Sequence, residues 1–254
     1  MTRNQGHLKA LGVDIGGSST KLCLIDKASK SILKKIIIPH KGEHSIDMIS
    51  SKIVQQIREW EVDGTIGIGF PGIIQNQVIV DAPNLGNVWN GHDFKAYFAP
   101  HDIEVVSVLN DADAAAMAMI EQSKDWTEDE VLCLTIGTGI GSGWISEGQL
   151  IKGTEYGREY SSKLQCTLEQ WASAKVIKEE GITFSEWVVR FSEVLDILIE
   201  NYSPEAVILC GGITTTKEDW LAELQALHSV RIAISDYEEY TGAYGASLLN
   251  QCKK

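Results

Sequence analysis

The chain has 254 residues, with 22 lysines and arginines against 35 aspartates and glutamates, and its formal net charge is −13. A hydrophobic fraction of 44% is enough to build a sizeable core, and the length allows one large domain or two smaller ones. The acidic balance argues against general binding of nucleic acids or anionic membranes, but not against a phosphorylated small ligand, because local backbone dipoles can bind phosphate.

The cysteines and the start of the chain indicate a compartment. Five dispersed cysteines without a C-x-x-C pair are typical of reduced thiols in a cytosolic protein. The polar residues 1–7 precede no apolar core of signal-peptide length, and no stretch approaches the roughly 20 apolar residues of a membrane span. We therefore expect a soluble, cytoplasmic and unprocessed protein.

The first half of the chain alternates short apolar runs with turn residues, which predicts strands before the first helix. Ser45 is the expected N-cap of that helix, whose apolar positions recur every three or four residues. The elements expected here are strands over 11–15, 22–25 and 32–38, a helix that begins at residue 46 and is ended by residues 63–64, strands over 65–70 and 103–109, and a helix over 114–121 that is opened by residues 110–113.

The second half begins as the first does, with a strand, a glycine-rich turn, a strand, a turn and a strand. The elements expected here are strands over 131–136, 144–145 and 149–151, a helix over 184–198, a strand over 207–210, a helix over 217–228, a strand over 230–234 and a helix over 242–250. Two halves with the same beginning predict a duplicated α/β unit with a cleft between the copies.

The first glycine turn follows the strand that ends near Asp14. Gly16 and Gly17 allow backbone N–H groups to approach a phosphate without a Cβ in the way. Asp14 is suited to hold a hydrated Mg²⁺, and residues 18–20 add hydroxyl donors. A plain β-hairpin turn explains the same residues equally well.

The second glycine turn is expected over residues 137–143, which carry Gly137, Thr138, Gly139 and Gly141, and the motif that includes it spans 135–143. Its spacing is not that of a Rossmann turn, because no helix follows directly, and it lacks the Gly-Lys-Ser/Thr of a Walker A loop. Two such turns opening two similar halves can hold one polyphosphate from both sides.

Asn110 and Asp111 stand where a strand is expected to give way to a helix. Composition alone favours a capping role, since Asn and Asp are common at helix N-termini. The functional alternative is a carboxylate that accepts a hydroxyl proton during phosphoryl transfer.

The order of these motifs resembles the ROK family of sugar kinases from residue 8 to near the C-terminus. Within that family, the chain is most similar to the polyphosphate/ATP glucokinase branch. The motifs that carry the resemblance are Asp14-x-Gly16-Gly17, Gly69-Phe70-Pro71-Gly72, Asn110-Asp111-Ala112-Asp113-Ala114-Ala115, the glycine-rich run over 135–143, Thr154-Glu155-Tyr156-Gly157, Gly211-Gly212 and the run over 241–246.

The resemblance implies an α/β, actin-like ATPase (ribonuclease H-like) fold of two similar lobes around a cleft. It places the first phosphate loop and the sugar loops in an N-terminal lobe over 1–110, completed by a C-terminal helix over 242–254. The second phosphate loop and the nucleotide edge fall in a C-terminal lobe over 111–241.

The resemblance also implies roles for individual residues. Asp111 would be the general base, and Asp14 would lie beside Mg²⁺. The residues implied to contact the sugar are Asn84, Asn110, Glu155, Arg158 and Glu169. The residues implied to contact the donor are Asp14, Gly16, Gly17, Ser18, Thr20, Lys21, Gly137, Thr138, Gly139, Gly211 and Gly212.

Two departures from the family pattern bear on these roles. Arg158 stands where the family has a histidine, and a fixed cation there either selects a sugar with an acidic group, weakens catalysis, or pairs with Glu155 or Glu159 at the surface. Cys166 is alone near the place of the family's zinc loop, so no structural zinc site is expected.

These observations predict a hexokinase/glucokinase-type phosphotransferase that uses Mg²⁺ and ATP or polyphosphate. ATP is favoured as the donor, because a chain of net charge −13 shows no basic track for a long polyanion. The alternatives are a catalytically weak ROK-fold sugar sensor and a kinase for an N-acetyl or acidic sugar. The expected partners are a sugar and a phosphoryl donor, with no nucleic acid and no membrane, and the family suggests a homodimer.

Overall fold

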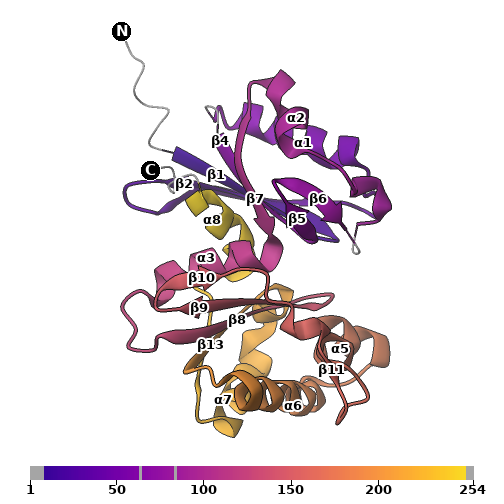
Figure 1. Cartoon of the computed structure of the whole chain (residues 1–254), viewed down its shortest axis with the longest axis vertical. Helices are drawn as coiled ribbons and strands as arrows, with labels where there is room; N and C mark the ends of the chain where they lie inside the picture. Colours follow the sequence, from indigo (N-terminus) through magenta and orange to yellow (C-terminus); the bar gives the residue numbers. More distant parts are fainter. Residues whose placement is uncertain (1–8, 63–64, 83–84, 250–254) are drawn as a thin grey trace. The chain divides into compact units, whose positions relative to one another are not determined.

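The computed structural model describes residues 9–62, 65–82 and 85–249 (Figure 1). The chain folds into two compact units, residues 1–118 with 242–254, and residues 119–241. The division falls within helix α3 (Asp111–Ser123), whereas the predicted lobe boundary falls at its first residue. The assignment of a functional lobe to each part of the chain stays a prediction.

The first unit is built on a five-stranded mixed sheet in the order β3-β2-β1-β4-β7. Its strands are β1 (Lys9–Ile15), β2 (Ser19–Asp26), β3 (Ile32–Pro39), β4 (Thr65–Phe70) and β7 (Glu104–Asn110). Strand β2 runs antiparallel to its two neighbours β1 and β3, and β1, β4 and β7 run parallel. The carboxyl ends of the three parallel strands therefore lie at the same edge of the sheet.

The connections of this unit carry shorter elements. Helix α1 (Ile46–Glu59) is capped by Ser45, whose hydroxyl accepts from the backbone N–H of Met48 at 3.3 Å. The remaining elements are the hairpin β5 (Ile73–Gln75) and β6 (Val78–Asp81), the 3-10 helices η2 (Asn87–Trp89) and η3 (Ala99–His101), and helix α2 (Phe94–Phe98). The core of the unit includes Phe70, Trp89 and Phe94, which pack as a group of buried rings.

The C-terminal helix α8 (Thr241–Leu248) packs directly on this sheet, beside β1 in Figure 1. A Cβ on Gly12 would lie 1.8 Å from the carbonyl oxygen of Ala243, and one on Gly67 would lie 2.0 Å from that of Ala246. These two strand positions must be glycine, because any side chain would displace the helix backbone. Helix α8 is thus a structural part of the first unit.

The second unit repeats the architecture of the first, with a sheet in the order β10-β9-β8-β13-β14. Its strands are β8 (Glu130–Ile136), β9 (Ile140–Ser146), β10 (Gln149–Ile151), β13 (Ala206–Cys210) and β14 (Arg231–Ile234). Strands β8, β9 and β10 are antiparallel neighbours, and β8, β13 and β14 are parallel. The order and directions match those of the first sheet, which confirms the predicted duplication.

Helices and short elements complete the second unit. These are the 3-10 helix η4 (Tyr156–Arg158), strands β11 (Tyr160–Ser161) and β12 (Cys166–Thr167), helices α4 (Leu168–Ala172), α5 (Ala174–Glu180) and α6 (Phe184–Tyr202), the 3-10 helix η5 (Gly212–Asp219), helix α7 (Leu221–Leu227) and the 3-10 helix η6 (Glu238–Tyr240). Thr183 begins α6 with a capping box, and the apolar face predicted for this helix is buried in the core.

Two predicted element boundaries are wrong. Strand β9 resumes at Ile140 and not at Trp144, because Ile140 pairs with Ile136 of β8 and is buried. The helix expected over 217–228 is instead a 3-10 helix followed by α7. Trp220 separates the two with φ −146°, and its buried ring donates from Nε1 to the Ile213 carbonyl at 3.2 Å.

Candidate active site

Two of the predicted functional carboxylates meet at the edge where β1, β4 and β7 end. Asp14 pairs with Gly69 across the β1–β4 ladder, and Asp111 follows β7 as the first residue of α3. An ideal Cβ on Gly69 would lie 3.6 Å from the α-carbon of Asp111 and 3.7 Å from Asp14 Oδ1. The fold thus brings together two acidic residues that are distant in sequence, next to a strand residue without a side chain.

Asp14 is held by its neighbours on two sides. Its carboxylate packs against Gly242 of α8, where a Cβ would lie 2.8 Å from Asp14 Cγ. Lys21 Nζ forms an ion pair with Asp14 Oδ2 at 3.5 Å. Both side chains are mostly buried, with 12% of the Asp14 and 21% of the Lys21 side chain exposed. Asp14 therefore has a defined position at the edge of the sheet.

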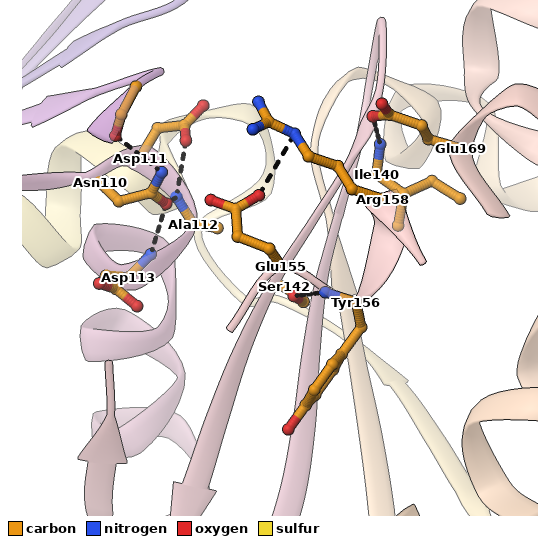
Figure 2. A network of polar contacts seen from close by, with 11 residues as sticks. Asn110, Asp111, Ala112, Asp113, Ile140, Ser142, Glu155, Tyr156, Arg158 and Glu169 are labelled. Atoms are coloured by element: carbon orange, nitrogen blue, oxygen red, sulfur yellow. Dashed lines mark hydrogen bonds and ion pairs between the residues drawn. The ribbon is translucent and has the colours of Figure 1, made fainter. Parts of the chain in front are cut away.

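Asn110 fixes the junction between β7 and α3. Its Oδ1 accepts from the backbone N–H of Ala112 at 2.8 Å, and its Nδ2 donates to the Gly72 carbonyl at 3.3 Å. Asp111 Oδ1 accepts from the same Ala112 N–H at 3.0 Å, and its carboxylate lies at the positive end of α3 (Figure 2). The capping role that composition favoured is therefore present, and it orients the carboxylate proposed as the base.

The first glycine turn connects β1 to β2. The Gly16 N–H donates to the Ser19 carbonyl at 2.9 Å and closes the turn, so Gly16 uses its own donor within it. Ser18 is exposed at the tip. Thr20 is 1% exposed and its Oγ1 is hydrogen-bonded to His40 Nε2 at 2.8 Å, so this hydroxyl is engaged inside the unit.

The second glycine turn connects β8 to β9 and is also closed internally. The Gly137 N–H donates to the Gly139 carbonyl at 3.0 Å, and Thr138 is exposed at the tip. Nothing lies within 4 Å of a Cβ placed on Gly137, so its open side faces free space in this structure.

Glu169 of α4 lies against the second glycine turn. Its Oε2 accepts from the Ile140 N–H at 3.4 Å and would lie 2.5 Å from a Cβ on Gly139 (Figure 2). The residue implied to contact the sugar therefore also contacts the turn implied to contact the donor. Both residues belong to the second unit.

Glu155 and Arg158 point toward each other across η4, with Arg158 Nε 3.4 Å from Glu155 Oε2 (Figure 2). About two fifths of each side chain is exposed, 44% for Glu155 and 42% for Arg158. The backbone beneath is tightly packed, since a Cβ on Gly157 would lie 1.9 Å from the Ile140 carbonyl oxygen. The structure thus has the Arg158–Glu155 pair that was one of the alternatives for Arg158.

The Gly211-Gly212 pair follows β13, next to the end of β8. Gly211 has φ +95°, and a Cβ on it would lie 2.5 Å from the Ile136 carbonyl oxygen, so conformation and packing both require glycine there. Gly212 is exposed with nothing within 4 Å of an added Cβ. Because β8 and β13 are parallel, this pair and the second glycine turn lie at the same edge of the second sheet. Asn84 lies outside the described residues.

Three contacts of these turns were missed by the sequence analysis. The Lys175 backbone N–H donates to the Gly137 carbonyl at 3.3 Å, and the Ser142 hydroxyl accepts from the Tyr156 N–H at 2.9 Å. His40 contacts the first glycine turn. No local motif marks these residues, and the signal that could have found His40 is its position directly after a strand that ends opposite the turn.

Comparison with known proteins identifies the class of the fold. The ROK family profile matches residues 10–158, more than half of the chain, and the chain belongs to the ROK family. A polyphosphate glucokinase of Mycobacterium tuberculosis is 29% identical over 221 residues, which cover 84% of this chain and 81% of the relative. A glucokinase of Thermotoga maritima is 28% identical over 153 residues, which cover 58% of this chain and 48% of the relative.

Solved structures agree. The inorganic polyphosphate/ATP-glucomannokinase of Arthrobacter sp. strain KM matches with a TM-score of 0.85 and 27% identity, covering 96% of this chain and 98% of that one. A ROK family glucokinase from Streptomyces griseus, solved with glucose and AMPPNP, shares the fold with a TM-score of 0.79 at 21% identity. The predicted family and actin-like ATPase fold are therefore confirmed. No helix among the described residues is long and apolar enough to cross a membrane.

Proposed function

We propose that this protein is a sugar kinase that transfers the terminal phosphoryl group of ATP or polyphosphate to a hydroxyl of glucose. The relatives support the phosphotransferase class, because both curated relatives compared above carry the name glucokinase. The structural observation that supports it most is the meeting of Asp14 and Asp111 beside Gly69. Phosphoryl transfer to an alcohol needs a base for the hydroxyl proton and compensation of the charge on the phosphates.

Asp111 is the base in this proposal. The sugar hydroxyl oxygen forms a bond to the terminal phosphorus while the bond from phosphorus to the bridging oxygen breaks, and the leaving phosphate keeps that electron pair. Asp111 takes the hydroxyl proton. Asn110 holds the start of α3 through its bonds to Ala112 and Gly72, which keeps the carboxylate in a fixed position. Such a base contributes about 10²–10⁴-fold to the rate.

The donor phosphates are bound by the two glycine turns, in which small residues let the backbone approach closely. We assign this role to Gly16, Gly17, Ser18, Thr20 and Lys21 in the first unit. The corresponding residues of the second unit are Gly137, Thr138, Gly139, Gly211 and Gly212, of which the last two contact the adenosine when ATP is the donor.

The residues at the first turn fit Mg²⁺ held largely by the donor. Magnesium usually keeps several waters and takes one or two carboxylates together with substrate phosphates. Among the described residues no group of three or more His, Cys, Asp or Glu side chains is placed to hold a metal, so a site with Asp14 as its single carboxylate is the kind that fits. When bound, Mg²⁺ offsets negative charge on the donor phosphates.

The sugar is bound by Asn84, Asn110, Glu155, Arg158 and Glu169 in this proposal. These side chains are suited to sugar hydroxyl groups, because carboxylates accept hydrogen bonds, the guanidinium donates them and the asparagine amide does both. The names of the relatives do not favour a sugar sensor or a kinase for acidic or N-acetyl sugars. A cytoplasmic location and a homodimer complete the proposal, and light scattering of the purified protein would test the latter.

The direct test is phosphorylation in the presence of Mg²⁺, with ATP and polyphosphate crossed against glucose, mannose, N-acetyl sugars and sugar acids. We expect turnover of glucose with at least one donor. Absence of turnover across the panel, while sugars still raise the melting temperature, would contradict a kinase and support a sensor.

A further inference from the structure

His40 belongs to none of the motifs above, and yet it contacts the first glycine turn. It directly follows the last residue of β3, and it is 1% exposed. Its backbone N–H donates to the Ser18 carbonyl at 2.9 Å, and its ring Nε2 is hydrogen-bonded to Thr20 Oγ1 at 2.8 Å. One buried side chain and its own backbone thus hold both ends of the segment 18–20.

These contacts are placed where they can control the shape of the turn. The β2–β3 ladder ends with Ser19 paired to Pro39, so His40 stands just beyond the last ladder pair. The Gly16 N–H closes the turn on the Ser19 carbonyl, which leaves the Ser18 side chain exposed at the tip. The outer side of the turn is open to a ligand, and His40 holds its inner side.

The His40 ring acts here as a hydrogen-bond partner and not as a charge. Burial is the largest effect on its pKa and lowers it, while the Gly17 backbone raises it in part and the neighbouring His44, Lys52 and Lys21 lower it further. Its Nδ1 is buried and has no well-aligned hydrogen-bond partner in the described part of the chain. With the Gly17 backbone, His40 thus contacts three residues of the first glycine turn, the others being Ser18 and Thr20.

We propose that His40 is a positioning residue for the donor: it holds residues 17–20 in the conformation that presents the first glycine turn to the donor phosphates. This inference rests on the proposed function, since it assigns the donor to that turn. It predicts that loss of the ring weakens binding of the donor and leaves binding of the sugar nearly unchanged.

His92 provides a matched control within the same unit. Like His40, it has one ring nitrogen, Nε2, that is buried without a hydrogen-bond partner among the described residues, and burial lowers its pKa. Its ring instead packs against the rings of Trp89, Phe94 and Tyr97. A general effect of removing an imidazole with a buried, unpartnered nitrogen should therefore appear in both variants, whereas an effect through the turn should follow His40 alone.

The experiment compares the wild type with His40→Leu, His40→Gln and His92→Leu. Donor affinity is measured twice, as the KM for ATP and polyphosphate and as the calorimetric Kd for AMPPNP, which needs no turnover. Glucose KM and melting temperature are recorded alongside. We expect His40→Leu to raise the donor KM and Kd about fivefold or more, the factor expected for one lost hydrogen bond. His40→Gln, which can still bond to Thr20, should restore most of the affinity.

The outcomes separate this inference from the proposed function. Donor affinity unchanged in His40→Leu, or lowered equally in His92→Leu, would overturn the role of His40. If His40→Leu does not fold, Thr20→Val replaces it, because valine keeps the shape of threonine and removes the hydroxyl that bonds to His40. Unchanged donor affinity in Thr20→Val would also overturn the positioning role of His40. A wild type that binds AMPPNP and phosphorylates no sugar would contradict the kinase alone, and the AMPPNP Kd would still decide on His40.

Discussion

Replacing Gly137 with alanine separates phosphate binding from stability at the second glycine turn. No atom lies within 4 Å of the added Cβ, and the φ of Gly137 lies outside the left-handed range, so the folded chain accepts the methyl group without strain. A glycine replaced by alanine at a compatible position gains about 0.4–1 kcal/mol of stability, because the unfolded chain loses freedom. The variant should therefore be as stable as the wild type or more stable.

The affinity of Gly137→Ala for the donor should fall, although its stability does not. If the donor phosphates approach the open side of Gly137, the methyl group keeps them away from the turn. The loss of one hydrogen bond to a charged group costs about 1.5–3 kcal/mol, which corresponds to a rise of the donor KM of about 10- to 100-fold. The assay is formation of phosphorylated glucose at varied ATP and at varied polyphosphate, with the melting temperature measured on the same samples.

Gly212→Ala is the matched control, because this glycine also has open space around an added Cβ and an ordinary φ. It should weaken ATP, whose adenosine is assigned to Gly212, and leave polyphosphate unaffected, whereas Gly137→Ala should weaken both donors. A stable Gly137→Ala protein with unchanged KM for both donors would refute the assignment of phosphate binding to this turn.

Three further predictions concern the sugar residues, the pH dependence and the packing of the C-terminal helix. Arg158→Ala should change the free energy of unfolding by less than about 1 kcal/mol, since the Arg158–Glu155 pair is exposed, but it should raise the glucose KM, because Arg158 is assigned to the sugar. An unchanged or lower glucose KM would show that the arginine only pairs with Glu155. Stability should fall as the pH drops below the usual histidine pKa of 6.5, because burial lowers the pKa of His40 and His92 and the unfolded chain therefore binds protons first. Urea unfolding at several pH values measures the slope of the unfolding free energy against pH. The same slope in a variant with both His40→Gln and His92→Gln would contradict this cause. Gly245→Ala should destabilise by about 1–3 kcal/mol, because its Cβ would lie 1.8 Å from a backbone carbonyl of α3, and a melting temperature equal to that of the wild type would contradict this packing.

The sequence predicts well those parts of the fold that depend on local chemistry. An apolar strand that runs into a glycine-rich turn occurs at Asp14 and again before Gly137, so the duplication could be recognised from one sequence. The capping function of Asn110 also followed from its type and place, and the structure has that contact. In each case, neighbouring residues carry the whole signal.

The parts that failed depend on contacts between distant residues. Gly141 lies inside β9 and not in a turn, because the strand continues through it in the ladder with β8. Trp220 interrupts the expected helix because its ring is fixed in the core by Ile213. His40 reaches the first glycine turn only through the pairing of β2 with β3, and no local spacing encodes that approach.

Asp111→Asn removes the carboxylate that acts as the base in the proposed sugar kinase and changes little else. Asparagine keeps the size of the side chain and an oxygen that can accept from the Ala112 N–H, so the start of α3 should stay intact. We measure Mg²⁺-dependent phosphorylation of glucose and, on the same protein, binding of glucose and AMPPNP. We expect a kcat lower by about 10²–10⁴-fold, with both ligands still bound. A variant that phosphorylates glucose at the rate of the wild type would contradict the role of Asp111 as the base.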